Sequence, residues 1–322
     1  MKAAVYDQAG PPSVFRYTDV PDPACAPDGV LIDVRAISIE GGDLLHRAQG
    51  PLATRPHIVG YQCAGVVLEI GPQVNDRHVG DRVVAVMTHG SHAQRVAVQA
   101  GATWALPEAL DFERGACVPI AVGTADDCLF EFGRLHAGET VLVQAGAGGV
   151  GMAAIQLAKR AGASVIATAS SATKLERLQA FGLDHGIDYA KQDFVAETRR
   201  LTGGRGADLV VDSVGGRTLQ GSIDAATYRG RIVTVGSAGR EADRIDVSAL
   251  RPGNKSLTGI FFGAELMLHT ARIKPMVQRH LEAVAKGELA IVIDRSYPLA
   301  EAAAAHAYIE SRRAFGRVLL VP

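Results

Sequence analysis

One stretch of the chain, VLVQAGAGGVGMAAIQLAK at residues 141–159, places four glycines within the six positions 146–151. An apolar β-type run, Val141–Val143, comes before the glycines, and an apolar helical run, Gly149–Arg160, begins among them. Three of the glycines satisfy the pattern GxGxxG, namely Gly146, Gly148 and Gly151. In that pattern the bare backbone admits a pyrophosphate, and the dipole of the following helix attracts it. Strand, turn and helix stand in the required order, so the stretch predicts a dinucleotide site rather than a plain packing turn.

The periodicity of apolar residues changes near residue 123 and indicates two domains. Before that point the chain has short β-type runs, at 30–38, 64–71, 81–87 and 92–100. After it, strand, glycine turn and helix repeat, which is typical of βαβ units with a parallel sheet. The fold class is therefore α/β, a doubly wound parallel sheet over 123–257 beside a β-rich domain from 1–122 and 258–322. Helices are expected around 270–287 and 299–311, and the closing strand RVLLVP is expected to return to the first domain.

Composition narrows the ligand and the compartment. The 322 residues carry 33 Lys and Arg against 34 Asp and Glu, with no basic stripe interleaved with aromatic residues. This balance favours neither nucleic acid nor a membrane surface as a partner. A small-molecule ligand is expected instead. The four cysteines show no paired spacing, so no disulfide is expected. No secretory leader and no apolar run near the roughly 18 residues of a membrane span is found, which predicts a cytoplasmic protein.

The residues after the second strand of the parallel sheet, expected at Ser164–Ala169, bear on the choice of cofactor. NAD sites usually have Asp or Glu there, whereas this chain continues Ala169, Ser170, Ser171 and then Lys174. Hydroxyls and an ammonium group suit a 2′-phosphate, so NADPH is favoured. The alternative is that Lys174 is only a solvated residue on its helix.

Several segments together give the chain a family resemblance. AGAGGVGMAAIQLAK, ATASSATK, GIDYAKQDF, LTGGRGADLVVDSVGG and SRRAFGRVLLVP follow one another as in the zinc-independent quinone oxidoreductases of the medium-chain dehydrogenase/reductase superfamily, and nearly the whole chain resembles them. The resemblance implies a GroES-like catalytic domain made from both termini and a Rossmann domain between them.

The resemblance also implies which residues contact the cofactor. Lys174 and Tyr189 would hold the 2′-phosphate. By the same resemblance, further cofactor contacts would be Thr124, Ser213, Gly236, Ser237 and Arg312. The predicted set is completed by the glycine turn at Gly146, Gly148, Gly149, Val150 and Gly151, by the hydroxyls of Ser170 and Ser171, and by Phe261.

The chain departs from its zinc-binding relatives at their ligand positions. Glu40 stands where those relatives have Cys, and Tyr61-Gln62 stands where they have His-Glu. Glu40 with His46, or His89 with His92, could offer donors, but neither pair has a recognised metal-ligand spacing. We therefore expect no metal.

SIEGGDLLHR, residues 38–47, also departs from the quinone oxidoreductase pattern, so the substrate pocket is expected to differ. We predict Glu40 and Asp43 as catalytic residues, with Gly41-Gly42 widening the pocket. The alternative turns Glu40 into a salt bridge and leaves the glycines to shape a loop. Substrate contacts are predicted at Glu40, His46, Tyr61, His92 and Phe262, although a solvent-exposed loop position is the simpler expectation for His92.

These features predict an NADPH-dependent oxidoreductase that transfers a hydride to a quinone or α,β-unsaturated carbonyl without metal. The alternative is a family member that binds NADPH and has lost turnover. The apolar β-type run at 255–262 would lie at a sheet edge and is expected to pair with its copy in a homodimer, unless the C-terminal helix covers that edge.

Overall fold

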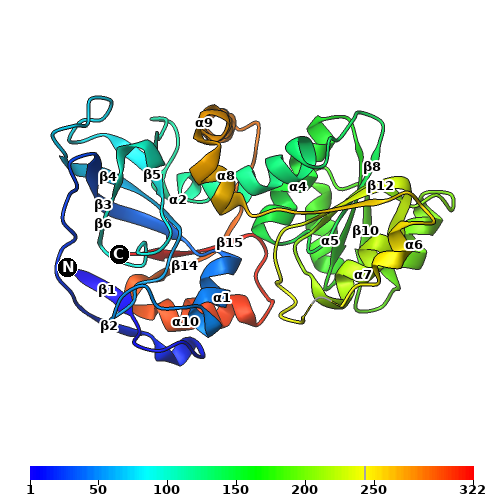
Figure 1. Ribbon diagram of the computed structural model, residues 1–322, viewed down its shortest axis with the longest axis horizontal. Coiled ribbons are helices and arrows are strands. Elements are labelled where there is room, and N and C mark those ends of the chain that lie inside the picture. The colour runs from blue at the N-terminus through cyan, green and yellow to red at the C-terminus, as the bar shows by residue number, and fades with distance from the viewer. Residues whose placement is uncertain (243) are drawn as a thin grey trace. The chain divides into compact units, whose positions relative to one another are not determined.

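The computed structural model describes residues 1–242 and 244–322. The chain forms two compact units (Figure 1). One comprises Met1–Ala121 and His269–Pro322, and the other comprises Val122–Leu268. We call them the terminal unit and the central unit.

The central unit is built on a six-stranded parallel sheet in the order β10-β9-β8-β11-β12-β13. Its strands are β8 (Thr140–Val143), β9 (Ser164–Ala169), β10 (His185–Asp188), β11 (Ala207–Asp212), β12 (Ala226–Thr234) and β13 (Ser256–Gly259). Its helices are α3 (Gly123–Asp126), η4 (Asp127–Glu131), α4 (Gly149–Arg160), α5 (Ala172–Gln179), α6 (Phe194–Leu201), α7 (Gly216–Ala225), η5 (Val247–Leu250) and α8 (Phe262–Leu268). A further helix, η3 (Val118–Val122), belongs to the terminal unit except for its last residue. In chain order the sheet reads 3-2-1-4-5-6, the doubly wound dinucleotide-binding arrangement.

Continuous apolar runs explain why the central strands lie inside this sheet. All four residues of β8 are buried, as is typical of parallel strands covered on both faces. The core around Leu142, Ile166, Val210 and Ile232 takes one residue from each of four adjacent strands. These strands therefore present their carboxyl ends from a rigid support.

The terminal unit contains a seven-stranded mostly antiparallel sheet and a separate β1-β2 pair. The sheet has the order β14-β15-β3-β4-β5-β7, with β6 also pairing β3. The strands are β1 (Lys2–Val5), β2 (Arg16–Asp19), β3 (Gly29–Ser38), β4 (Gln62–Ile70), β5 (Arg82–Val86), β6 (Arg95–Gln99), β7 (Thr103–Ala105), β14 (Ile293–Pro298) and β15 (Arg317–Val321). The helices are η1 (Pro12–Val14), α1 (Gly41–Gln49), η2 (Ala100–Ala102), α2 (Phe112–Gly115), α9 (Thr270–Ala285), η6 (Leu299–Glu301) and α10 (Ala302–Glu310).

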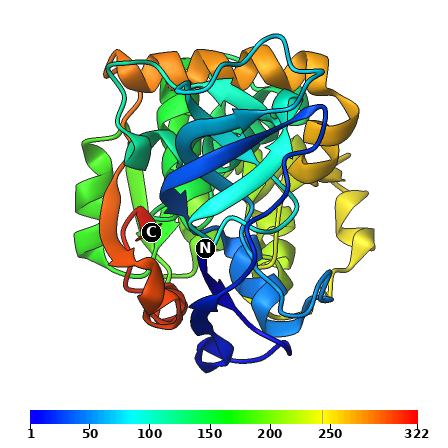
Figure 2. The same cartoon turned by 90° about the vertical axis from the view of Figure 1, so that its left-hand side faces the viewer.

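Two segments far along the chain complete the terminal unit. Strand β15 pairs with β3 through Leu319 and Ser38, which confirms the expected return of the closing strand. Figure 2 shows α9, in orange, running along one side of the strands of this unit. The indole Nε1 of Trp104, on β7, donates to the Lys274 carbonyl of α9 at 2.9 Å.

The boundary between the units differs from the one expected at 257/258. That position lies inside β13, which pairs in register with β12 from Ser256 to Gly259. The chain stays in the central unit as far as Leu268. No helix in the described ranges is long and apolar enough to cross a membrane.

Candidate functional site

The glycine turn between β8 and α4 leaves little room for side chains. A Cβ at Gly151 would lie 2.4 Å from the Ala145 carbonyl oxygen, and one at Gly146 would lie 2.9 Å from the Ala167 Cβ. At Gly148, the N-cap of α4, the nearest such atom is 3.4 Å away and the residue is exposed. Two glycines thus serve close packing, and the third leaves the helix N-terminus open.

This turn occupies the switch point of the sheet. From β8 the chain moves outward to β9 and β10 on one side, and to β11, β12 and β13 on the other. Doubly wound sheets bind ligands outside the carboxyl ends of the strands at that point. Helix α4 has no acidic residue in its first turn, so its N-terminus retains its attraction for an anion.

The residues predicted for the 2′-phosphate follow two paired strands. Asp188 on β10 is in register with Ala169 on β9, and the Tyr189 amide donates to the Ala169 carbonyl at 3.2 Å. Ser170 and Tyr189 therefore begin at neighbouring strand ends. The Ser171 hydroxyl oxygen accepts from the Lys174 amide at 3.4 Å and caps α5.

The half-buried Lys174 lies in the first turn of α5, on the side of the sheet where these strand ends meet. Tyr189 is 43% exposed, so its ring is accessible to a ligand. The structure thus brings together the four residues Ser170, Ser171, Lys174 and Tyr189.

Two further predicted cofactor residues lie where β11 and β12 end. Asp212 pairs in register with Thr234, and Ser213 and Gly236 follow these strands. Gly236 has φ +136°, a value that glycine adopts readily. The Ala238 amide donates to the Ser213 carbonyl at 3.1 Å, which holds the two loops, including Ser237, together.

Of the remaining predicted residues of the central unit, two are buried and one is exposed. Thr124 is buried on α3, and Phe262 is 5% exposed with its ring against Gly123, where a Cβ would meet Phe262 Cζ at 2.5 Å. Phe262 is thus a packing residue between α8 and α3. Phe261, by contrast, is 75% exposed.

In the terminal unit, Glu40 belongs to a buried ionic cluster. Its carboxylate accepts from Arg317 at the start of β15 and from the Gln62 amide nitrogen. The Arg317 guanidinium also donates to the Ser38 hydroxyl at 2.6 Å and to the Ile39 carbonyl at 2.9 Å. Burial raises the pKa of Glu40, while Arg317 opposes that shift. Of the two alternatives for Glu40, the structure shows the salt bridge.

Asp43 and Tyr61 meet at the N-terminus of α1. Asp43 is fully buried, and its Oδ2 accepts from the Glu40 amide at 2.8 Å. A Cβ at Gly42 would lie 2.5 Å from Tyr61 Cε2, so the Tyr61 ring fills the space that Gly42 leaves. Gly41 is exposed with nothing within 4 Å of a Cβ. Gly42 therefore accommodates an aromatic ring rather than widening a pocket.

Three histidine rings stack in this unit. His57 lies between His46 and His89, with centroid distances of 5.1 and 5.4 Å. His46 Nε2 donates to the Pro51 carbonyl at 2.5 Å. Burial lowers the pKa of His57 to about 4, which keeps that ring neutral at neutral pH.

His92 is not the solvent-exposed loop residue expected from the sequence. It is fully buried, stacks on Phe15, and places Nε2 3.1 Å from Nε2 of His306 on α10. Burial lowers its pKa to about 3. The substrate contact predicted at His92 is also wrong, because its ring is enclosed by protein.

Arg312 has φ +58° in the turn after α10 and is exposed. Among residues 1–242 and 244–322, no group of three or more His, Cys, Asp or Glu side chains is arranged to hold a metal ion.

Sequence reasoning missed the positioning roles of three residues that hold predicted site residues in place. Arg317 and Gln62 bind Glu40, and Asp212 accepts from the Val214 and Gly215 amides at 2.8 and 2.9 Å, holding the loop that contains Ser213. A charged residue opening the otherwise apolar run RVLLVP was the available signal for Arg317.

Comparison with protein families agrees with this two-unit architecture. Residues 26–154 match the alcohol dehydrogenase GroES-like domain, and residues 149–286 match the zinc-binding dehydrogenase domain. These two domains define the chain as a medium-chain dehydrogenase/reductase.

Individual relatives narrow the family. The 2-haloacrylate reductase of a Burkholderia species is 33% identical over 99% of this chain and 98% of its own length. The Escherichia coli quinone oxidoreductase complexed with NADPH superposes with a TM-score of 0.95 at 27% identity, covering 100% of both chains. The quinone oxidoreductase of Pseudomonas syringae pv. Tomato gives 0.94 at 29% identity, covering 100% and 99%. The chain belongs to the quinone oxidoreductase family of this superfamily.

Proposed function

We propose that the chain is an NADPH-dependent reductase that transfers a hydride to a quinone or α,β-unsaturated carbonyl without a metal ion. The observation that carries this proposal is the glycine turn at the switch point, with an exposed Gly148 and hydroxyl and ammonium side chains after β9. Two of the relatives are quinone oxidoreductases, one of them complexed with NADPH, and the third is named for reducing a 2-haloacrylate.

The pyrophosphate would lie on the amides of the turn and the first turn of α4, at Gly146, Gly148, Gly149, Val150 and Gly151. The Gly148 and Gly149 backbone is accessible there, as binding requires. When bound, NADPH supplies the hydride, and the protein orients it and excludes water.

The end of β9 supports NADPH over NADH. With Ala169, Ser170 and Ser171 there is no carboxylate to repel a 2′-phosphate, and Lys174 provides a positive charge one turn into α5. Tyr189 would cover the phosphate from the end of β10. The other predicted contacts, Thr124, Ser213, Gly236, Ser237, Phe261 and Arg312, remain proposals for the rest of the cofactor.

The ionic cluster supports metal-independent reduction. Glu40 already shares its carboxylate with Arg317 and Gln62, and a metal ion at Glu40 would lie beside the buried guanidinium. Such a site repels a second cation. Quinones and enones are electron-poor, so their reduction needs less electrophilic assistance than that of a simple ketone.

The test is loss of NADPH absorbance with a panel of quinones, enones and 2-haloacrylates, before and after prolonged chelation. We expect oxidation of NADPH by at least one acceptor and full activity after chelation. A stoichiometric metal whose removal abolishes turnover would contradict the metal-free reaction. Tight NADPH binding with no oxidation by any acceptor would instead favour a binding protein that has lost turnover.

A further inference from the structure

Four buried polar side chains connect the carboxyl ends of β9, β8 and β11 in the central unit. They are Thr168, the last residue but one of β9, Gln144 directly after β8, Ser222 on α7, and Asp212 at the end of β11. Each is at most 2% exposed. Buried polar groups are costly unless they are hydrogen-bonded, so their presence beside an apolar sheet needs a physical reason. We call these four side chains the Gln144 network.

The hydrogen bonds of the Gln144 network run in one direction. The Ala145 amide donates to the Thr168 hydroxyl oxygen at 3.2 Å, and that hydroxyl donates to Gln144 Oε1 at 2.8 Å. Gln144 Nε2 donates to the Ser222 hydroxyl oxygen at 3.2 Å, and Ser222 donates to Asp212 Oδ2 at 2.7 Å. A carboxylate only accepts, so Ser222 must give its single proton to Asp212 and accept from Gln144. The orientation of the Gln144 amide is therefore fixed by its neighbours.

The network joins three loops that hold predicted cofactor residues. At one end, Thr168 leads into the loop after β9, and its carbonyl accepts from the Gly146 amide at 2.8 Å. At the other end, Asp212 Oδ1 accepts from two amides of the loop that contains Ser213. Gln144 lies between them and leads directly into the glycine turn. A single set of buried hydrogen bonds therefore fixes the spacing between the glycine turn and the strand ends on both of its sides.

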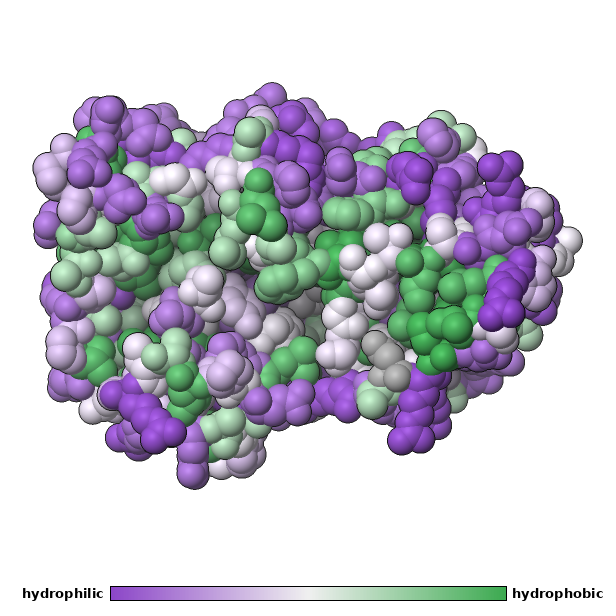
Figure 3. Space-filling model, in the orientation of Figure 1, coloured by the Kyte–Doolittle hydropathy of each residue, from purple (hydrophilic) through white to green (hydrophobic). Residues whose placement is uncertain are grey.

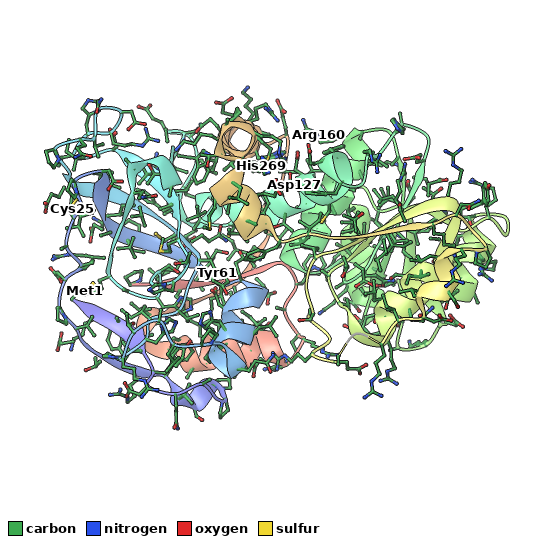
Figure 4. The ribbon with its side chains drawn as sticks, in the orientation of Figure 1. Met1, Cys25, Tyr61, Asp127, Arg160 and His269 are labelled. Carbon is green, nitrogen blue, oxygen red and sulfur yellow. The ribbon has the colours of Figure 1, made fainter. Side chains whose placement is uncertain are left out.

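The glycine turn contains a residue in an unfavourable backbone conformation. Ala145 has φ +53°, in the left-handed region that residues with a Cβ seldom adopt. Its amide is held by Thr168, and its carbonyl accepts from the Gly148 amide at 3.0 Å. Such a conformation persists only where the surroundings over-determine it, and it is found most often at functional sites. Figure 4 labels Arg160, the last residue of α4, and the turn lies at the opposite end of that helix. The network thus holds the strained residue beside the open N-terminus of α4.

We propose that Gln144 and Ser222 are positioning residues for the cofactor: through the network they hold the glycine turn and the loops after β9 and β11 in one arrangement, in which all three contact the same dinucleotide. This inference rests on the proposed function and deepens it, because it names residues that act on cofactor binding without touching the cofactor. A site whose parts are already arranged binds more tightly, since less ordering is required on binding. A purely structural role would change folding stability and leave the affinity of the folded protein unchanged.

The first test removes one hydroxyl from the network. Ser222→Ala changes little volume and suits a helix, but it breaks the link between Gln144 and Asp212. The NADPH dissociation constant, measured by fluorescence titration, should rise about 10-fold, the worth of one hydrogen bond. Thr198→Val is the matched control, because the Thr198 hydroxyl is also buried in the central unit but donates within α6, to the Phe194 carbonyl at 2.7 Å. Both variants should lower the thermal unfolding midpoint, and only Ser222→Ala should weaken NADPH binding.

The second test separates positioning from a direct contact with the 2′-phosphate. Ser222→Ala should weaken NADH by the same factor as NADPH, because the glycine turn and its flanking loops would contact parts that both cofactors share. Gln144→Leu, which removes both amide hydrogen bonds, should weaken both cofactors at least as much, and Ser222→Ala alone decides if that variant does not fold.

Two results for Ser222→Ala would overturn the proposal. One is a folded variant, verified by circular dichroism, that binds NADPH within about twofold of wild type. The other is a loss confined to NADPH, which would indicate a 2′-phosphate contact instead. If wild-type protein binds neither NADPH nor NADH, the proposed function itself fails and this inference fails with it.

Discussion

At the residue scale, the Glu40–Arg317 ion pair is the contact whose loss should most reduce the stability of the terminal unit, because both side chains are buried. Their exposed fractions are 6% and 9%. Removing one member of a buried pair leaves the other charge uncompensated, which typically costs about 3–5 kcal/mol. The stability of the terminal unit is therefore expected to be sensitive to the loss of the Glu40 carboxylate.

We predict that Glu40→Gln lowers the free energy of unfolding of the terminal unit by about 3–5 kcal/mol. Urea unfolding can be followed by the fluorescence of Trp104, the one tryptophan in the chain, which is buried in that unit. Glu241→Gln, which breaks an exposed pair with Arg217, is the control and should leave the Trp104 transition unchanged. A Glu40→Gln midpoint equal to wild type would show that the pair contributes no net stability.

The second prediction at this scale concerns Lys174. Lys174→Ala should weaken NADPH binding about 10- to 100-fold, the worth of one hydrogen bond to a charged group, and leave NADH binding nearly unchanged. Fluorescence titration with both cofactors measures this, with the exposed neighbour Thr173→Ala as control. Equal losses for the two cofactors would rule out a 2′-phosphate contact.

Sequence reasoning left Glu40 open between a pocket and a salt bridge for a physical reason. Its partner Arg317 is 277 positions away, and the contact forms only because β15 joins the sheet beside β3. The proposed 2′-phosphate site could be predicted from sequence, since Ser170, Lys174 and Tyr189 follow consecutive strands of one βαβ unit. A site built from consecutive elements can be predicted from the sequence, whereas an ion pair between strands far apart in the sequence can be found only once the fold is known.

At the scale of elements, α10 is tied to the loop before β6 by two histidines. One ring nitrogen of His92 faces one of His306 at 3.1 Å, so one must donate and the other accept. Both rings are buried, and burial lowers the pKa of each. The accepting imidazole must therefore be neutral, and burial favours the neutral form of the donating ring as well.

We predict that acid weakens the terminal unit through this pair. In the unfolded chain a histidine has a pKa of about 6.5, whereas burial lowers the pKa of His92 in the folded protein to about 3. Between these pH values, only the unfolded chain takes up a proton at this residue. The contribution of these histidines to the free energy of unfolding is therefore fully present above about pH 6.5. It falls as the pH drops below that value, by up to about 1.4 kcal/mol per pH unit for each histidine.

The Trp104 urea transition, measured in steps from neutral to acid pH, checks this slope. His92→Gln should lower stability at neutral pH and make the slope shallower, because one titrating ring is gone. A His92→Gln variant with the wild-type slope would assign the acid sensitivity to other groups, His57 first among them.

Elements with strong apolar periodicity could be predicted closely. The expected helix Gly149–Arg160 and strand Ser164–Ala169 are observed with the same bounds. The π-helical segments η3 and η4 were not anticipated, because i→i+5 bonding leaves no distinct period in a short apolar run. The expected helix at 299–311 begins in the structure with the short η6 turn and continues as α10.

At the scale of the whole molecule, the central sheet ends in an open strand. Among residues 1–242 and 244–322, β13 pairs only with β12, and both of its terminal residues, Ser256 and Gly259, are exposed. Three large apolar side chains that follow β13 in the chain are also exposed, namely Phe261, Met267 and Leu268. Figure 3 shows apolar surface on the central unit. An unprotected edge of this kind tends to pair with another chain.

We therefore propose that the protein forms a twofold dimer in which β13 pairs with its copy, since a closed dimer uses the same edge twice and leaves none free. The geometry selects the variant that tests it. The Ile260 amide donates to the Thr234 carbonyl of β12 at 2.9 Å. Amides alternate in direction along a strand, so Thr258 also faces β12 and Gly259 faces outward. Proline at Thr258 would damage the sheet itself.

Gly259→Pro removes an outward donor and should convert the dimer to monomer while leaving the central unit folded. Gly259→Ala is its matched control, because a Cβ at this position meets nothing within 4 Å and the amide is kept. Light scattering at micromolar concentration, with circular dichroism to verify folding, should show dimers for wild type and Gly259→Ala and monomers for Gly259→Pro. A monomeric wild type would refute the dimer, and a dimeric Gly259→Pro would place the interface away from β13.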